Sequence, residues 1–312
     1  MSSRSTLDLS VVIPVLNEEE SVSVLHRELL EVLVPSGKSF EIIFVDDGSR
    51  DGTFRALSAL SPVTVLRFTR NFGKSQALQA AFDRARGEYI LTMDGDLQDD
   101  PKEIPAFFAK LEEGHDLVVG WKQRRLDSGA RRLGSKVANG VTRAFTGVNV
   151  HDMNCCFKLY RSEVAKGLSL WGDMHRYIPA LAAAAGFSVA EVPVNHRSRR
   201  FGRSKYGIGR LFAGLFDFLT LVFLRLFTDR PMYFFAAVGS ALSLLGIATL
   251  VYLSALKIFT GALIGDRPLL VLGVLFLIVG FQSLSLGFIG ELVIRQNPSE
   301  RRSFVLRETL ER

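Results

Sequence analysis

The chain has 312 residues, of which 48% are hydrophobic and 22% are charged, a composition that supports a folded core and excludes intrinsic disorder. Its two cysteines, Cys155 and Cys156, are adjacent, which excludes a disulfide framework. The net charge of +6 is unevenly spread, because residues 1–114 carry 12 basic and 19 acidic side chains, whereas residues 115–231 carry 19 basic and 8 acidic ones. The acidic first third argues against a continuous basic track, so we expect no nucleic-acid partner.

Apolar, β-branched runs alternate with helical patterns over the first third of the chain. We expect strands at 9–15, 40–45, 63–68, 88–93 and 116–120, and helices at about 18–33, 51–60, 74–86 and 101–113. This alternation is typical of an α/β domain whose mainly parallel sheet has helices on both faces. In such sheets, ligands bind beyond the carboxyl ends of the strands.

Polar side chains gather at three of these predicted strand ends. They are Pro14, Asn17 and Glu18 after the first strand, Asp46 and Asp47 after the second, and Asp94, Asp96 and Gln98 after the fourth. Asp46 and Asp47 directly follow a buried strand, which favours hydrogen bonds to a base or ribose over a simple turn. No GxGxxG or GxxxxGKS sequence is present, which argues against dinucleotide-binding and P-loop folds.

The segment MDGDLQDDP predicts a divalent metal site. Asp94 and Asp96 are two residues apart at a strand end, so an extended backbone directs both carboxylates to the same side. With the Gln98 amide they supply hard oxygen ligands suited to Mg²⁺ or Mn²⁺, which substrate phosphates and water would complete. The alternative is an acidic turn that caps the next helix, and we assign that role to Asp99 and Asp100.

The earlier segment RNFGKSQALQAAF, at 70–82, is open to two interpretations. Asn71, Gly73 and Lys74 either touch a bound donor or simply begin a helix.

Two uncharged runs near the C-terminus, 232–256 and 268–290, predict a transmembrane hairpin. At about 1.5 Å per residue, each crosses the roughly 30 Å hydrocarbon layer, and runs this long are uncommon in the core helices of soluble proteins. Arginines flank the hairpin on its outer sides, so the positive-inside rule puts both termini in the cytoplasm. Residues 208–231 are apolar but interrupted by charges, which favours interfacial helices. Gly280, Gly287 and Gly290 permit close helix contact, from which we expect a homo-oligomer.

The motifs VVIPVLNEEE, FVDDGSRDGT and MDGDLQDDP, in this order and spacing, resemble the nucleotide-sugar half of family 2 glycosyltransferases, which have the GT-A fold. The resemblance continues through GWKQRRLDSGARRLGSK, HDMNCCFKLYRSE and RSRRFGRSKYG to the hairpin. Together these segments are similar to the polyprenyl-phosphate glycosyltransferases, the group that contains dolichyl-phosphate mannose synthase and the bacterial undecaprenyl-phosphate glucose and aminoarabinose transferases.

The resemblance implies a role for each motif residue. It implies a metal at Asp94, Asp96 and Gln98, nucleotide contacts from Pro14, Asn17, Glu18, Asp46 and Asp47, and acceptor-phosphate contacts from Arg131, Ser135, Arg199 and Lys205. Lys122 is a further acceptor-phosphate candidate, although dolichyl-type members usually have arginine there and lysine binds phosphate only as a point charge.

Asp152 either orients a basic residue, acts near the anomeric carbon, or is an ordinary turn aspartate. The candidate catalytic residues are Asp96, Asp152, Arg131 and Lys205.

The basic second third suits this chemistry. A lipid phosphate monoester has a second pKa near 6, so it is mostly a dianion at neutral pH and needs no strong general base. The site must instead hold two anionic substrates together, which requires cations and a metal.

We therefore expect an inverting transfer from a nucleotide sugar, UDP-glucose or a related UDP-sugar, to undecaprenyl phosphate at the cytoplasmic membrane face. The alternatives are a mannosyltransferase that uses GDP-mannose and, from another class, a non-catalytic nucleotide-sugar sensor or transport subunit. A processive polysaccharide synthase is disfavoured, because Trp121 and Trp171 lack its QxxRW context.

These patterns divide the chain into four parts. They are a cytoplasmic GT-A domain at 1–207, a juxtamembrane segment at 208–231, the hairpin at 232–290 and a basic cytoplasmic tail at 291–312.

Overall fold

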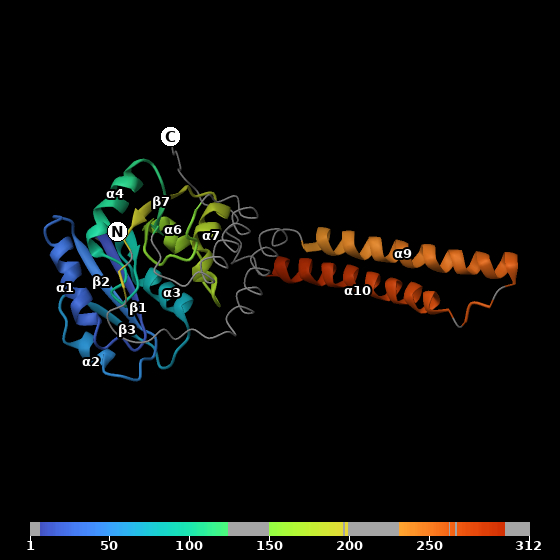
Figure 1. Ribbon diagram of the computed structural model, residues 1–312, viewed down its shortest axis with the longest axis horizontal. Coiled ribbons are helices and arrows are strands. Elements are labelled where there is room, and N and C mark those ends of the chain that lie inside the picture. Colours follow the sequence, from blue (N-terminus) through green and yellow to red (C-terminus); the bar gives the residue numbers. More distant parts are fainter. Residues whose placement is uncertain are drawn as a thin grey trace. The chain divides into compact units, whose positions relative to one another are not determined.

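The computed structural model describes residues 7–123, 150–195, 197–198, 231–261, 263–265 and 267–296 (Figure 1). These residues fall into an α/β unit and a separate helical hairpin. The predicted domain boundaries at 207 and 231 stay predictions, and most of the predicted interfacial segment 208–231 lies outside the described residues.

A seven-stranded sheet with the order β3-β2-β1-β4-β6-β5-β7 forms the centre of the α/β unit. Its strands are β1 (Leu7–Val15), β2 (Phe40–Asp46), β3 (Thr64–Arg67), β4 (Gly87–Thr92), β5 (Leu117–Lys122), β6 (Lys158–Arg161) and β7 (Val189–Val194). All pairs are parallel except those of β6, which runs antiparallel to both β4 and β5. The prediction of a mainly parallel sheet is therefore confirmed.

Helices cover the sheet, which Figure 1 shows between α1 and α2 on one side and α3 and α6 on the other. The helices are α1 (Val22–Leu33), α2 (Thr53–Ser58), α3 (Lys74–Arg84), α4 (Ile104–Glu112), α6 (Ser162–Gly167) and α7 (Ile178–Ala184), with short 3₁₀ turns η1 (Pro101–Glu103) and η2 (Met174–Tyr177). Central strand β1 is buried on both faces, with Val11, Val12 and Ile13 inaccessible, so its sequence is continuously apolar rather than alternating.

The strands β6 and β7 were not predicted. β6 has only four residues, one of them the buried Lys158, and so gives no apolar pattern. β7 contains Pro193, which weakens a strand prediction but is tolerated here because β7 lies at the edge of the sheet.

Helices α9 (Pro231–Thr260) and α10 (Pro268–Gln296) form the hairpin, and both are long and apolar enough to span a membrane. The glycines of α10 face α9 of the same chain. A Cβ atom on Gly239 would lie 2.7 Å from the carbonyl oxygen of Gly280, and one on Gly287 would lie 3.0 Å from the Met232 sulfur. The expected close helix contact is therefore present, but it lies within the hairpin of one chain, so the homo-oligomer stays a prediction.

The substitution Gly246→Val tests this packing. A Cβ atom there would lie 2.8 Å from the carbonyl oxygen of Gly273, which is backbone and has no room to move aside. We expect a loss of about 1–3 kcal/mol of stability, measured as a lower Tm of the detergent-solubilised protein. Gly265→Ala is the control, because no atom lies within 4 Å of the added methyl group. An unchanged Tm for Gly246→Val would contradict the observed helix contact.

Candidate active site

The sheet brings the predicted site segments to one edge. β1 lies between β2 and β4, with Val15 opposite Asp46 and Val12 opposite Thr92. Because these strands are parallel, the loops that follow them leave the sheet side by side. The segments 14–18, 46–49 and 94–98 therefore meet, as the sequence predicts.

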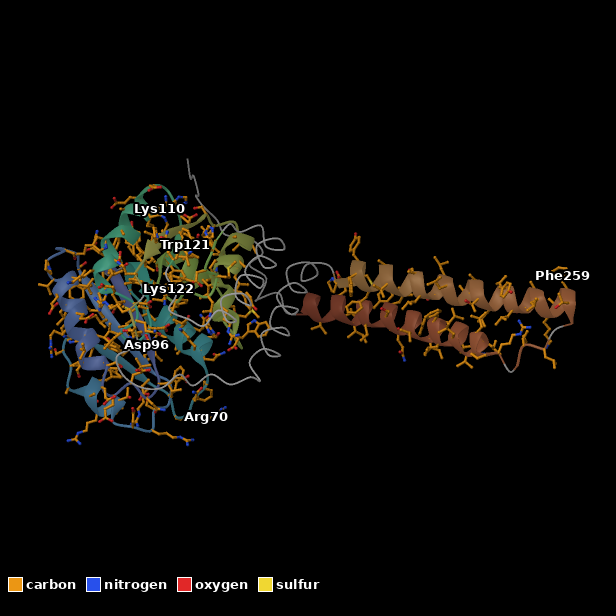
Figure 2. The ribbon with its side chains drawn as sticks, viewed as in Figure 1. Arg70, Asp96, Lys110, Trp121, Lys122 and Phe259 are labelled. Atoms are coloured by element: carbon orange, nitrogen blue, oxygen red, sulfur yellow. The ribbon has the colours of Figure 1, made fainter. Side chains whose placement is uncertain are left out.

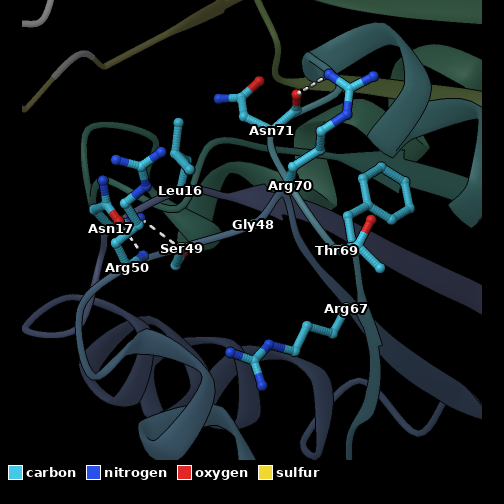
Figure 3. A pocket seen from close by; sticks show the side chains of 10 residues that line it. Leu16, Asn17, Gly48, Ser49, Arg50, Arg67, Thr69, Arg70 and Asn71 are labelled. Carbon is cyan, nitrogen blue, oxygen red and sulfur yellow. Dashed lines mark hydrogen bonds between the residues drawn. The ribbon is translucent and has the colours of Figure 1, made fainter.

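A cavity of about 650 Å³ opens at the ends of β1, β2 and β3 (Figure 3). Its lining residues are Leu16, Asn17, Gly48, Ser49, Arg50, Arg67, Phe68, Thr69, Arg70 and Asn71. Asn17 joins two of its walls, because its backbone N–H donates to Ser49 Oγ at 2.9 Å and its side-chain oxygen accepts from the Arg50 N–H at 2.8 Å. Asn17 has φ of 52°, a left-handed conformation that asparagine tolerates better than most residues.

Asp46 and Asp47 hold the segments that line this cavity. Both are buried; Asp46 accepts the Ser49 N–H at 2.8 Å and lies 3.6 Å from Arg67. The two oxygens of Asp47 accept the backbone N–H groups of Phe72 and Gly73, at 2.7 and 3.0 Å. Burial raises the pKa of Asp47, an effect that these two hydrogen bonds only partly oppose. Asp47 thus fixes the loop over 68–73, and direct contact of either carboxylate with a nucleotide stays a prediction.

Glu18 and Pro14 lie at the end of β1. The Glu18 backbone N–H donates to Thr53 Oγ1 at 2.8 Å, and its carboxylate accepts from Ser21 Oγ at 2.8 Å, which ties the start of α1 to α2. Pro14 pairs with Val45 in the sheet and is half-buried.

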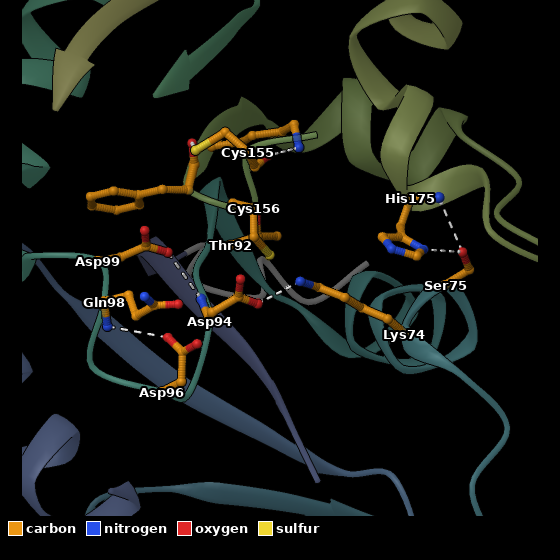
Figure 4. A network of polar contacts seen from close by, with 12 residues as sticks. Lys74, Ser75, Thr92, Asp94, Asp96, Gln98, Asp99, Cys155, Cys156 and His175 are labelled. Atoms are coloured by element: carbon orange, nitrogen blue, oxygen red, sulfur yellow. Dashed lines mark hydrogen bonds and ion pairs between the residues drawn. The ribbon is translucent and has the colours of Figure 1, made fainter. Parts of the chain in front are cut away.

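The turn after β4 carries the three predicted metal ligands (Figure 4). Asp96 is nearly buried and accepts the Gln98 backbone N–H at 3.1 Å. Leu97 lies between them with φ of 63°, an uncommon conformation for a leucine. Backbone strain of this kind persists only where the surroundings enforce it, and it clusters at functional sites.

Lys74, the first residue of α3, reaches this turn and pairs with Asp94 at 2.5 Å. Burial by itself would raise the pKa of the Asp94 carboxyl, but Lys74 and then Lys122 hold it well below its usual range. Lys74 therefore does more than begin a helix: it neutralises one of the predicted metal ligands.

The donor set fits a divalent ion that is shared with a substrate. Among the residues described, no three His, Cys, Asp or Glu side chains lie close enough together to hold a metal. The turn offers Asp96, Gln98 and the Lys74-paired Asp94, and Mg²⁺ is commonly bound through one or two carboxylates plus substrate phosphates. These oxygens therefore suit an ion that enters with a phosphorylated substrate.

Asp99 joins the β4 turn to β5. It is buried, accepts the Asp94 N–H at 3.3 Å and pairs with Lys122 at 2.8 Å. Burial would lower the pKa of Lys122, but the Asp99 carboxylate raises it above its usual range. The helix-capping role predicted for Asp99 was wrong, because the cap is Asp100, which accepts the Lys102 N–H at 3.0 Å.

Figure 2 shows Lys122 and Asp96 inside the α/β unit, whereas Lys110 and Arg70 lie at its surface.

Asp152 is buried beside β7. Its backbone N–H donates to Glu191 of β7 at 3.1 Å, and the neighbouring His151 pairs with the same carboxylate at 2.8 Å while it stacks on Trp121. The segment is therefore fixed to β7 and β5. Four predicted residues, Arg131, Ser135, Arg199 and Lys205, lie outside the described residues, so their roles stay predictions.

Most of the residues that line the cavity were not predicted from the sequence. Arg67 lies near the end of the third predicted strand, and Thr69 and Arg70 follow it, but only Asn71 in this part of the chain was considered as a donor contact. The strand-end rule applied to that strand would have found them.

Asp47→Asn tests the supporting role of this carboxylate. The two loop N–H groups bond to different oxygens of Asp47, and asparagine replaces one of these with an NH2 donor, so we expect a loss of about 1–3 kcal/mol and weaker nucleotide binding, measured by thermal unfolding and calorimetry. Asp83→Asn is the matched control, because Asp83 is exposed on α3 and bonds only to Gln79 among the contacts described. Equal effects of the two substitutions would argue against the role.

Residues 10–168 match the family model "Glycosyl transferase family 2". The chain is 39% identical over 300 residues to a dodecaprenyl-phosphate galacturonate synthase of Rhizobium johnstonii. The aligned region covers 93% of this chain and 88% of the relative. It is 36% identical over 293 residues to an undecaprenyl-phosphate 4-deoxy-4-formamido-L-arabinose transferase of Shewanella sediminis, with 92% and 87% covered.

Solved structures share the fold. Glucosyl-3-phosphoglycerate synthase from Mycobacterium tuberculosis, in complex with Mn²⁺ and UDP-glucose, matches with a TM-score of 0.55 at 20% identity, over 70% of this chain and 79% of that one. Its complex with Mg²⁺ and UDP matches with a TM-score of 0.54, also at 20% identity and with the same coverage. This likeness confirms the expected GT-A type of α/β fold.

Proposed function

Because the chain belongs to glycosyl transferase family 2, we propose that this glycosyltransferase moves a sugar from a nucleotide sugar to a polyprenyl phosphate at a membrane. The observation that carries the proposal is the extent of similarity to the galacturonate synthase, a relative named for a polyprenyl-phosphate product. That similarity covers 93% of the chain, so it includes both the α/β unit and the hairpin. The two apolar helices supply the membrane association that a lipid acceptor requires.

The nucleotide of the donor belongs in the cavity at the ends of β1 to β3. The guanidinium groups of Arg50, Arg67 and Arg70 give this cavity a positive lining, which suits an anionic nucleotide. We propose a UDP-sugar as donor, UDP-glucose or a related one, with GDP-mannose as the alternative. Relatives named for galacturonate and formamidoarabinose extend the set of sugars that needs testing.

The reaction is a single displacement with inversion at the anomeric carbon. An oxygen of the dianionic lipid phosphate attacks that carbon, and the bond to the nucleoside diphosphate breaks, with its electron pair leaving on the diphosphate. A divalent ion, Mg²⁺ or Mn²⁺, would neutralise charge on the departing diphosphate. Asp96 and Gln98, with Asp94, would hold it.

Other residues of this chain prepare the site for the two anionic substrates, the nucleotide sugar and the lipid phosphate. Lys74 offsets the charge of Asp94, and Asp47 fixes the cavity loop. We assign the acceptor phosphate to Arg131, Ser135, Arg199 and Lys205, and keep Lys122 as a further candidate although it is paired with Asp99. We assign a catalytic role to Asp152 beside Asp96, Arg131 and Lys205.

The predicted topology completes the proposal. With both termini and the α/β unit in the cytoplasm, the enzyme uses cytoplasmic nucleotide sugars and delivers the product into the inner leaflet.

Full-length protein in detergent, incubated with undecaprenyl phosphate and labelled nucleotide sugars, tests the function. The panel contains UDP-glucose, UDP-galacturonate, UDP-linked 4-formamidoarabinose and GDP-mannose. We expect label in the lipid phase with one UDP-sugar. Binding of a nucleotide sugar without any lipid product would favour the non-catalytic sensor instead.

Asp96→Asn tests the metal ligand. The amide keeps the shape of the side chain but removes the charge that a divalent ion requires, so we expect transfer to fall by about a hundredfold or more while the Tm stays near that of the unmodified protein. The rate is measured as lipid-linked label at saturating Mg²⁺, with Asp83→Asn as control. Retained turnover at saturating Mg²⁺ would refute the metal assignment.

A further inference from the structure

Arg197, three residues after β7, bridges two acidic side chains from different parts of the α/β unit. Its Nη1 donates to Glu28 of α1 at 2.6 Å, and its Nη2 lies 2.6 Å from the Asp100 carboxylate. All three side chains are more than two-thirds buried, with exposed fractions of 27%, 21% and 17%. The planar guanidinium fork suits such a bridge, since it presents several donors in fixed directions.

The same segment also contacts the β4 turn through its backbone. The Arg197 N–H donates to the Gln98 carbonyl oxygen at 3.0 Å, and Gln98 Nε2 lies 3.5 Å from the Arg197 carbonyl oxygen. Two residues earlier, Asn195 Nδ2 donates to Glu103 at 2.7 Å. The residues after β7 thus hold the turn over 98–103 at several points.

The turn needs this support. Leu97, at φ of 63°, lies between Asp96 and Gln98, and a left-handed leucine is retained only where its neighbours enforce it. Single exposed ion pairs contribute little stability. Here one guanidinium joins two largely buried carboxylates that line a cleft of about 200 Å³ and would otherwise repel each other.

We propose that Arg197 is a positioning residue for the metal site: it holds the β4 turn so that the oxygens of Asp96 and Gln98 are arranged before the divalent ion binds. The inference rests on the proposed function, because it requires a metal at that turn. Arg197 does not touch the ion: its guanidinium acts through Asp100, while its backbone contacts Gln98 whatever the side chain. Loss of such an outer partner typically weakens metal binding by about 10–100-fold.

The test measures Mn²⁺ binding directly, by the loss of the free-ion EPR signal, with full-length protein in detergent and saturating UDP. We expect Arg197→Gln to raise the Kd for Mn²⁺ by about tenfold, the lower end of that range. Arg197→Lys should recover only part of the affinity, because an ammonium group cannot bridge both carboxylates in the fork geometry.

The matched control is Arg86→Gln. Like Arg197, Arg86 uses two guanidinium nitrogens to bind carboxylate, in this case Glu41 alone, at 3.1 and 2.9 Å. Arg86 precedes Gly87 at the amino end of β4, the opposite end from the metal-site turn. Both Gln variants should lower the Tm. Only Arg197→Gln should change the Kd for Mn²⁺, which separates positioning of the turn from general destabilisation.

Each outcome decides the question. An unchanged Kd in folded Arg197→Gln overturns the inference and leaves the proposed function standing. If neither the unmodified protein nor Asp96→Asn binds Mn²⁺ with UDP, the metal site of the proposed function fails first, and the inference fails with it.

If Arg197→Gln does not fold, Glu28→Gln and Asp100→Asn decide in its place. Each removes one ion pair, and asparagine at position 100 still caps η1. A raised Kd for Mn²⁺ in both supports the inference, and an unchanged Kd in both overturns it.

Discussion

The carboxylates at the carboxyl edge of the sheet repel one another, and the α/β unit is built to offset that repulsion. Each has a donor: backbone N–H groups for Asp46, Asp47 and Asp96, and the ammonium groups of Lys74 and Lys122 for Asp94 and Asp99. A buried ion pair such as Lys122–Asp99 adds little net stability over a well-packed apolar pair, but loss of one partner leaves a buried charge uncompensated. The effect of these contacts is therefore to fix geometry, and they place the end of β5 and the start of α3 against one turn.

The aspartates of these motifs have two different roles. Asp47 and Asp99 are buried. Asp47 accepts hydrogen bonds from the loop over 68–73, and Asp99 pairs with Lys122 of β5. Asp96 lies on the β4 turn, and the residues after β7 contact that turn. A motif rich in aspartate thus contains both the groups proposed to meet substrate and the groups that position them.

The sequence predicted the part of the site that follows from strand topology. Parallel strands end at one edge, so the clusters at 14–18, 46–47 and 94–98 were correctly expected to meet. Contacts between distant segments could not be foreseen, because no local pattern encodes them: Lys74 with Asp94, Lys122 with Asp99, and Arg197 with Glu28. The helix that the glycines of α10 contact could not be foreseen for the same reason, since a small residue permits close approach without specifying which helix approaches.

The small number of protein oxygens at the β4 turn has a consequence for the order of events in the proposed reaction. With Lys74 paired to Asp94, much of the negative charge that would attract a cation to the free protein is already offset. A nucleoside diphosphate would add both charge and oxygen ligands, so we expect the proposed ion to bind well only when the donor is present. Metal binding and donor binding are then thermodynamically linked, and each strengthens the other by the same factor. A turn held in advance by its neighbours strengthens the binding of the ion itself, because less ordering remains to be done when the ion arrives.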